Sequence, residues 1–332
     1  MQSVERIDIK TMIFDKIFLS IYKKTLITRQ DDTGDTFYFD YTDFDGLNKD
    51  HFAFVSKTGA RLDGGFYFYD NPKADKLIVF DHGMGVGHRP YMREIETICK
   101  AGYLVFSYDH EGTRNSEGAT IRGLSGSIRD LDSALDAIKA TKYYDGREVI
   151  VIGHSWGGLS TKNIAALHPE VKKIVPMAGL SSVEETMKRI VPGIFKSARK
   201  AILDFEESMN PGYVSLNAID SIKKSGVKAL ICHSVNDPVV PVKDHHHPLM
   251  EAFKGDENVR FITVEDRFHN PNITVAAVKA LSAFFNEKKD LAKRGKLKTP
   301  EEKAALIARH DFWQITEQDM TLWNQIFAFI EE

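Results

Sequence analysis

A single serine lies in a motif that favours nucleophilic chemistry. The apolar run 149–152 is followed by 153–157, a G-x-S-x-G sequence with Ser155 at its centre, and then by residues compatible with a helix. A strand, a sharp turn and a helix form a nucleophile elbow, which exposes the serine hydroxyl at the end of the strand. A hydroxyl is a weak nucleophile near neutral pH, so it requires a base and N–H groups that bind the developing oxyanion. We expect Ser155 to be the nucleophile if the chain supplies both.

A carboxylate and an imidazole follow later strands in the order that such a site needs. Asp237 comes directly after the apolar run 227–232, and His269 comes after the run 259–264. We predict that His269 removes the Ser155 proton, and that Asp237 fixes the imidazole tautomer and stabilises the imidazolium. Asp237 could instead be only a turn former before proline. Two other carboxylates, Asp244 and Asp266, are then the alternative acids.

Backbone N–H groups that could bind an oxyanion are available at two places. One is Trp156, the residue that follows the nucleophile. The other is the glycine-rich loop 81–88 after the run 77–80, where we choose the N–H of Met84, although the assignment could shift by one residue.

The remaining histidines are interpreted as structural. The tract His245 to His247 is predicted to be the exposed start of a helix, because consecutive helical residues point in different directions and cannot share a metal. We therefore predict no metal site. His82 and His154 are expected to orient loops, and His88 is placed at the mouth of the pocket.

The pattern of apolar residues predicts an α/β protein. Three aromatic, alternating runs between residues 35 and 70 predict an antiparallel strand group, and short apolar runs alternating with helical stretches follow residues 71–72. The predicted central strands are Leu77–Phe80, Tyr103–Tyr108, Val149–Ile152, Ile174–Met177, Val227–Cys232 and Val259–Val264. The predicted helices are Tyr91–Lys100, Ser125–Ala140, Gly157–Leu167, His245–Phe253 and Asn272–Glu287.

The domain organisation is predicted from changes in this pattern. Residues 35–179 and 226–289 form the core, and the apolar, interrupted insertion 180–225 is expected to form a helical cap that contributes some side chains to the pocket. Residues 1–34 form an amphipathic extension. Residues 290–332 form a helical extension with capping sequences at 299–302 and 316–319. Its apolar residues must cover either the protein body or another subunit.

Composition excludes several classes of protein. The 44 basic and 47 acidic residues of the 332-residue chain are interspersed, so no nucleic-acid footprint is present. Cys99 and Cys232 follow no spacing pattern and are expected to be reduced, in keeping with a cytoplasmic location. Charged residues interrupt the apolar N-terminal segment, so we expect neither a secretory signal nor stable membrane insertion.

Taken together, these motifs identify a resemblance. The H-G-x-G sequence at 82–85, the G-H-S-x-G-G sequence at 153–158 and the D-x-x-V-P sequence at 237–241 resemble the α/β-hydrolase superfamily, in particular its serine aminopeptidase S33 and monoacylglycerol lipase-like branch. The resemblance covers about 52–287. It implies an α/β-hydrolase fold with an eight-stranded, mostly parallel sheet, helices on both faces and a helical cap between strands six and seven. It also implies hydrolysis of an ester, thioester or amide without a cofactor.

We therefore expect a serine hydrolase of the carboxylesterase or acylglycerol lipase-like type, acting on a small acyl substrate through an acyl-serine intermediate. A peptidase or amidase with the same triad is the first alternative, with possible acidic anchors at Glu184, Glu185, Glu206 and Glu207. A non-catalytic binding protein on the same fold is the second. A homodimer through the terminal helices is a further expectation.

Overall fold

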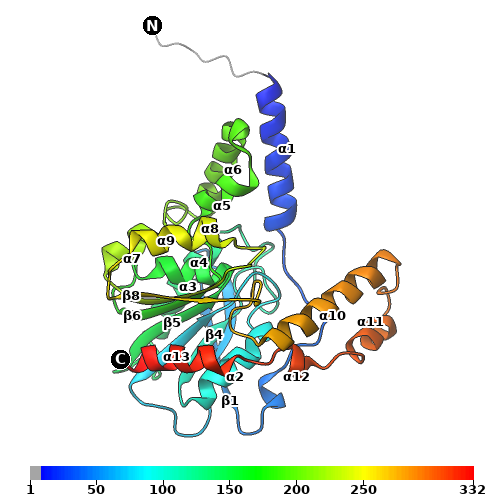
Figure 1. The fold of residues 1–332 in the computed structure, drawn as a ribbon. Helices are drawn as coiled ribbons and strands as arrows, with labels where there is room; N and C mark the ends of the chain where they lie inside the picture. The colour runs from blue at the N-terminus through cyan, green and yellow to red at the C-terminus, as the bar shows by residue number, and fades with distance from the viewer. Residues whose placement is uncertain (1–8) are drawn as a thin grey trace.

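An eight-stranded sheet forms the centre of the molecule (Figure 1). The computed structural model describes residues 9–332. Along the sheet the strands follow the order β1-β2-β4-β3-β5-β6-β7-β8. Their bounds are β1 Asn48–Val55, β2 Arg61–Phe68, β3 Lys76–Asp81, β4 Leu104–Tyr108, β5 Glu148–His154, β6 Val171–Met177, β7 Lys228–Ser234 and β8 Val259–Val264. The six predicted central strands are confirmed.

The sheet is mostly parallel, with an antiparallel edge. Strands β3 to β8 pair in parallel, whereas β2 pairs antiparallel with both β1 and β4. Only two of the three predicted aromatic strands form, because the segment around Phe37 and Phe39 pairs with no strand and instead continues into a 3-10 helix at Tyr41–Asp43. The rings of Phe37 and Phe39 pack against Phe312 and Trp313 near the C-terminus. Aromatic packing, and not strand pairing, explains the alternation there.

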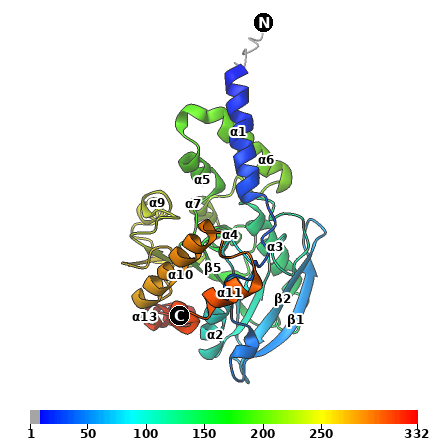
Figure 2. The same ribbon diagram turned by 90° about the vertical axis from the view of Figure 1, so that its right-hand side faces the viewer.

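Helices cover both faces of the sheet, as the turned view also shows (Figure 2). One core layer joins the sheet to α2 (Met92–Lys100), α10 (Val275–Lys293) and α13 (Met320–Glu331). The other joins it to α3 (Gly126–Ile138), α4 (Trp156–Ile164), α7 (Ala218–Ser225) and α9 (His247–Ala252). Successive strand residues alternate between the two layers, since side chains of a strand point to opposite faces. The inner strands β3 and β5 are therefore apolar and buried over most of their length.

The C-terminal segment packs on the body of its own chain. Helices α11 (Pro300–Ile307), α12 (Phe312–Ile315) and α13 follow α10, and Trp323 and Ile326 of α13 are fully buried in the core. The capping box at Thr299 is confirmed. The second predicted start is displaced, because Asp319, and not Thr316, accepts the N–H of Thr321 and caps α13.

The N-terminal helix α1 (Ile9–Leu26) stands out from the body beside α6 (Lys196–Met209) (Figures 1 and 2). The Phe18 ring packs on Phe195, and the buried hydroxyl of Tyr22 donates to the carboxylate of Glu206. Within the predicted cap segment, α5 (Val183–Ile190) and α6 contact each other, whereas α7 packs on α4 and α9. The remaining short helix, α8, spans Val242–His245.

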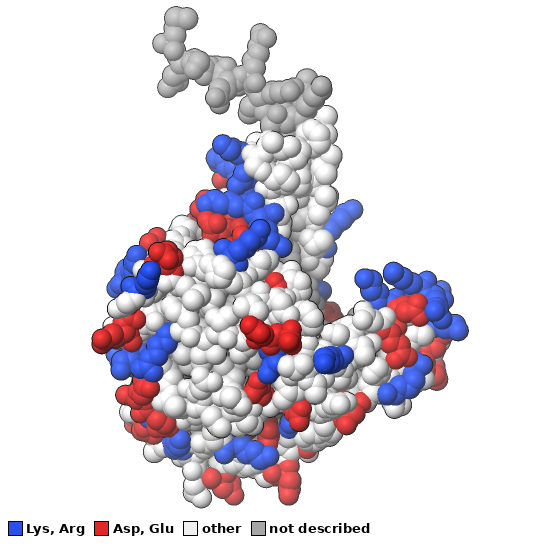
Figure 3. Space-filling view, viewed as in Figure 1, with Lys and Arg blue, Asp and Glu red and all other residues white. Residues whose placement is uncertain are grey.

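Surface charge is mixed. On the face shown in Figure 3, basic and acidic side chains are interspersed over the body, and α1 is a largely uncharged column. Among residues 9–332, no helix combines the length and the hydropathy needed to cross a bilayer.

Candidate active site

Ser155 occupies a tight turn between β5 and α4. Its backbone has φ 57° and ψ −111°, a conformation that side-chain-bearing residues rarely adopt. The flanking glycines make the turn possible: a Cβ at Gly153 would lie 2.2 Å from Oγ1 of Thr161, and one at Gly157 would lie 2.1 Å from the carbonyl oxygen of Asp81. The G-x-S-x-G pattern therefore has a steric reason: the close packing on both sides of Ser155 leaves no room for a Cβ at Gly153 or Gly157.

The three predicted side chains meet at the C-terminal ends of the parallel strands. His269 Nε2 lies 2.8 Å from Ser155 Oγ, and His269 Nδ1 lies 2.8 Å from Asp237 Oδ2. Asp237 Oδ1 accepts the N–H groups of Val239 and Val240. Burial would raise the pKa of Asp237, but hydrogen bonds from His233 and His269 outweigh it and hold the pKa well below its usual range. Asp237 is thus an ionised partner for His269.

His154 holds the loop that carries His269. Its Nε2 donates to the carbonyl oxygen of His269 at 2.8 Å, and the hydroxyl of Tyr91 lies 3.0 Å from its Nδ1. Burial and the neighbouring His269 lower the pKa of His154 to about 3, so the ring is neutral at physiological pH. A neutral Nε2–H tautomer satisfies both contacts, with Tyr91 as the donor to Nδ1.

The two predicted oxyanion donors flank Ser155. Trp156 is the first residue of α4, where the backbone N–H has no acceptor within the helix. Its indole Nε1 donates to the carbonyl oxygen of Leu124 at 2.7 Å, which anchors the side chain. The loop of Met84 crosses close to the serine, because a Cβ at Gly83 would lie 3.2 Å from Ser155 Cβ.

Three histidines lie elsewhere than expected. His88 is buried and not at the pocket mouth: its Nδ1 is 2.6 Å from Asp109 Oδ1 and its Nε2 is 2.7 Å from the Tyr67 hydroxyl. His245 and His246 are fully buried, which corrects the prediction of an exposed helix start. Two short helices, α8 and α9, meet there, and the junction turns both rings inward.

A pocket of about 360 Å³ opens beside Ser155 and His269. Its walls come from segments far apart in the sequence, namely 36–39, 83–94, the α10 region and the residues around α12. The apolar lining includes Phe37, Phe39, Ile273, Leu281, Phe284, Phe285, Phe312 and Ile315. Among the described residues of 180–225, none lines it, so the prediction that the cap segment contributes to the pocket is wrong. Apolar residues of the cap segment instead form a hydrophobic cluster with Trp156 and Met84.

The acidic residues proposed as anchors in the cap segment also lie outside the pocket. Glu184 and Glu185 pair with Lys188, and Glu206 is buried against Tyr22 and the N–H of Leu124. The carboxylate that does line the pocket is Glu94 of α2, which the sequence analysis missed. A signal for it was available, because Glu94 shares the apolar helical stripe of Tyr91, Ile95 and Ile98.

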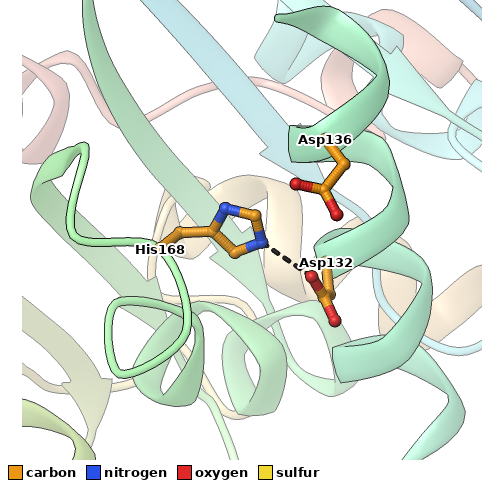
Figure 4. Close-up of side chains that lie close together, drawn as sticks. All are labelled: Asp132, Asp136 and His168. Atoms are coloured by element: carbon orange, nitrogen blue, oxygen red, sulfur yellow. Dashed lines mark hydrogen bonds and ion pairs between the residues drawn. The ribbon is translucent and has the colours of Figure 1, made fainter.

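One cluster has the composition of a metal site. Asp132, Asp136 and His168 bring one ligand atom each within 4.8 Å of one another, and His168 Nε2 bonds to Asp132 Oδ1 at 2.8 Å (Figure 4). Lysine side chains already balance the carboxylates: Lys57 pairs with Asp132, and Lys139 lies 3.2 Å from Asp136. We therefore interpret the cluster as an ion-pair network that joins α3 to the loop after α4.

Comparison with known sequences finds distant relatives of this chain. Residues 72–212 match the family model described as serine aminopeptidase, S33. A monoglyceride lipase homolog of Monkeypox virus is 38% identical over 88 residues, which are 26% of this chain and 30% of that protein. A probable esterase, PIR7A, of Oryza sativa subsp. indica is 28% identical over 141 residues, which are 39% of this chain and 52% of that protein. The chain thus matches about half or less of each of these relatives.

Solved structures share the fold. The Pyrococcus furiosus esterase Pf2001 superposes with a TM-score of 0.57 at 19% identity, over 82% of this chain and 97% of that one. Est1E from Butyrivibrio proteoclasticus, solved with ferulic acid bound, gives a TM-score of 0.53 at 18% identity, over 71% of this chain and 98% of that one. Both similarities establish the architecture of the sheet and its helices.

Proposed function

We propose that this chain is a serine hydrolase that cleaves carboxylic esters through an acyl-Ser155 intermediate. Its fold and its distant similarity to a monoglyceride lipase homolog and to esterases support the proposal. The observation that carries the proposal is the continuous contact from Asp237 through His269 to Ser155, with 2.8 Å at each step. That contact lies at the wall of an apolar pocket.

In the proposed reaction, Ser155 Oγ attacks the ester carbonyl carbon while His269 Nε2 takes the hydroxyl proton. The backbone N–H groups of Trp156 and Met84 bind the oxyanion. The C–O bond to the alcohol then breaks, and His269 returns the proton to the leaving oxygen. Water attacks the acyl-enzyme with the same base and releases the carboxylic acid, which regenerates Ser155.

An ester is favoured over a peptide by the chemistry of the pocket. The lining is mainly aromatic and aliphatic, and Glu94 is the only carboxylate among the described lining residues. A substrate with a free amino terminus would require an ionised acidic anchor, whereas the cap-segment carboxylates lie elsewhere. Buried apolar walls favour an uncharged acyl or alcohol group.

A fluorophosphonate probe tests the proposal. We expect the folded protein to be labelled and Ser155→Ala to be unlabelled. Ser160→Ala, in the helix that follows Ser155 and bonded to Asp81, should keep the labelling. Panels of p-nitrophenyl esters and aminoacyl anilides then separate esterase from peptidase. Equal labelling of Ser155→Ala, or no labelling of the wild type, would favour the binding-protein alternative.

The proposal includes a cytoplasmic location and a homodimer. Both cysteines are buried free thiols, which suits a reducing compartment. Because α13 is buried on its own chain, a dimer would have to use α1, where Ile13, Ile17 and Ile21 are about half exposed. Light scattering that gives a monomeric mass would remove the dimer from the proposal.

A further inference from the structure

Glu94 is a buried carboxyl group in the wall of the apolar pocket. It is 7% exposed and lies in α2, three residues after Tyr91. The Tyr91 hydroxyl lies close to Ser155. A Cβ placed at Gly83 would be 2.3 Å from the Tyr91 hydroxyl and 3.2 Å from Ser155 Cβ. Tyr91 directly precedes α2, and three residues correspond to nearly one helical turn, so Glu94 lies roughly 5 Å farther along the chain direction of the helix than Tyr91.

The two oxygens of Glu94 have different environments. Oε1 accepts a hydrogen bond of 2.8 Å from the side-chain amide of Asn272, which also lies 3.2 Å from Gln318 Oε1. The indole of Trp323 donates to the same Gln318 oxygen at 2.9 Å. This chain of contacts fixes the orientation of the carboxyl group. Oε2 is buried and has no hydrogen-bond partner among residues 9–332.

An unpartnered buried carboxyl oxygen carries a desolvation penalty, and natural proteins seldom retain one without a use. Burial raises the pKa of Glu94 above its ordinary value, although hydrogen bonds from the backbone and from the side chains of Asn272 and Gln318 act in the opposite direction. Because Oε1 already accepts a hydrogen bond from Asn272, Oε2 is the oxygen with unused hydrogen-bonding capacity. A carboxyl oxygen without a partner can bond to a hydroxyl group, which both donates and accepts hydrogen bonds.

We propose that Glu94 binds an aliphatic hydroxyl group of the substrate, on the part of the ester that fills the pocket and several atoms from the scissile carbonyl. The proposal rests on the proposed esterase function and adds a substrate class to it. Apolar walls at Phe284, Phe312 and Ile315 would hold the intervening carbon chain. Glu94 would then select hydroxylated esters over purely aliphatic ones, since a site built to bond a hydroxyl discriminates against analogues that lack it.

Isosteric ester pairs test the selectivity on both sides of the ester bond. For the acyl side, p-nitrophenyl 6-hydroxyhexanoate is compared with the heptanoate, and the 8-hydroxyoctanoate with the nonanoate. For the alcohol side, 6-hydroxyhexyl butanoate is compared with heptyl butanoate. We expect kcat/KM for the hydroxylated member to exceed that of its methyl isostere by about tenfold in at least one arm. The arm that shows the preference identifies which part of the ester occupies the pocket.

Three variants assign the preference to one side chain. Glu94→Met should remove the hydroxyl preference and raise kcat/KM for the methyl isostere, because the unpartnered oxygen is gone. Glu94→Gln keeps a donor and an acceptor and should retain most of the preference. Glu96→Gln is the matched control: it neutralises a buried carboxylate of the same helix that lies outside the pocket and pairs with Lys100, so the wild-type ratio should persist.

The outcomes separate this inference from the proposed function. If wild-type protein reacts with the fluorophosphonate probe but shows no hydroxyl preference in any pair, the role of Glu94 is refuted and the esterase proposal stands. The same holds if Glu94→Met keeps the preference and only lowers Tm, which would make Glu94 a structural residue. A higher rate with the 6-aminohexanoate than with the 6-hydroxyhexanoate would also refute it. If the wild-type protein shows neither labelling nor ester hydrolysis, both the esterase proposal and the role of Glu94 are refuted.

Discussion

At the scale of single residues, hydrogen bonds fix the orientation of the Asp237 and His269 side chains in the candidate site. Asp237 is held by two backbone N–H groups on one oxygen and by His269 on the other, so its carboxylate cannot rotate freely. His154 holds the backbone of His269 through a hydrogen bond to its carbonyl oxygen. The imidazole is thereby restrained at both its ring and its main chain, which keeps Nε2 directed at Ser155.

Replacing Asp237 by Asn tests this restraint. The amide preserves the size of the side chain but removes the charge that favours the imidazolium and permits the wrong tautomer of His269. We expect kcat to fall by about 10³- to 10⁴-fold with little change in KM. Asp244→Asn is the matched control, since Asp244 pairs with Arg189 at 3.0 Å and should keep activity within about twofold. Steady-state kinetics on a p-nitrophenyl ester measures both; full activity in Asp237→Asn would reject the assignment.

At the scale of elements, the C-terminal helices α13 and α12 have different roles: α13 belongs to the core and α12 lines the pocket. α13 completes one core layer, with Trp323 fully buried and its indole bonded to Gln318. α12 is only one turn long, yet Phe312 and Ile315 form part of the pocket wall. A segment that follows the hydrolase core in the sequence thus contributes both to stability and to the shape of the site.

The two tryptophans of this segment should therefore respond differently to truncation. Trp323→Ala leaves a cavity and removes the indole hydrogen bond to Gln318, and we expect it to lower the free energy of unfolding by about 3–5 kcal/mol. Trp313→Ala removes a ring that is 49% exposed and packs over Phe39 and Arg93, so the loss should stay below about 2 kcal/mol. Urea unfolding followed by circular dichroism compares them. Equal losses would contradict the burial of α13.

How far the sequence could anticipate these elements depended on the range of the interactions involved. The parallel strands were predictable because their apolar runs are local, and the elbow because glycine is required on both sides of Ser155. The pocket wall was not, since Phe37 and Phe312 are recognisable as neighbours only after folding. The burial of His245 and His246 likewise depends on the junction of α8 with α9, and no local pattern signals it.

At the scale of the whole molecule, a buried charged network connects the sheet to α3. His110 lies between two carboxylates, with Nε2 3.0 Å from Asp81 and Nδ1 3.3 Å from Asp130, and all three side chains are fully buried. Burial alone would lower the pKa of His110, but the two carboxylates raise it to about 9. Burial would raise the pKa of Asp130, yet its charged neighbours Arg129 and His110 lower it to about 2.

The sign of each shift predicts how stability changes with pH. The raised pKa of His110 stabilises the fold fully below about 6.5, and that contribution is lost as the pH rises through about 9. The lowered pKa of Asp130 stabilises above about 4 and is lost as the pH falls toward 2. Urea unfolding from pH 4 to 10 should therefore give a maximum between pH 4 and 6.5, as far as these groups are concerned.

A variant isolates the alkaline part of this prediction. The difference in unfolding free energy between wild type and His110→Gln should be largest near pH 6 and smaller by about 1–3 kcal/mol at pH 10. The exposed His247→Gln serves as the control and should follow the wild-type curve. A difference that does not change with pH would show that His110 is not charged in the fold.

The composite origin of the pocket has a consequence for biosynthesis. A ribosome completes the elbow, the carboxylate and the imidazole by residue 269, but the far wall of the cavity includes Ile315 and Thr316. A nascent chain that has exposed only its first 300 residues therefore has the reactive groups without an enclosed place for a ligand. The proposed activity should therefore arise only after residues 312–316 have been synthesised and have packed on the body. Products truncated before them would lack the far wall of the pocket even where the core has folded.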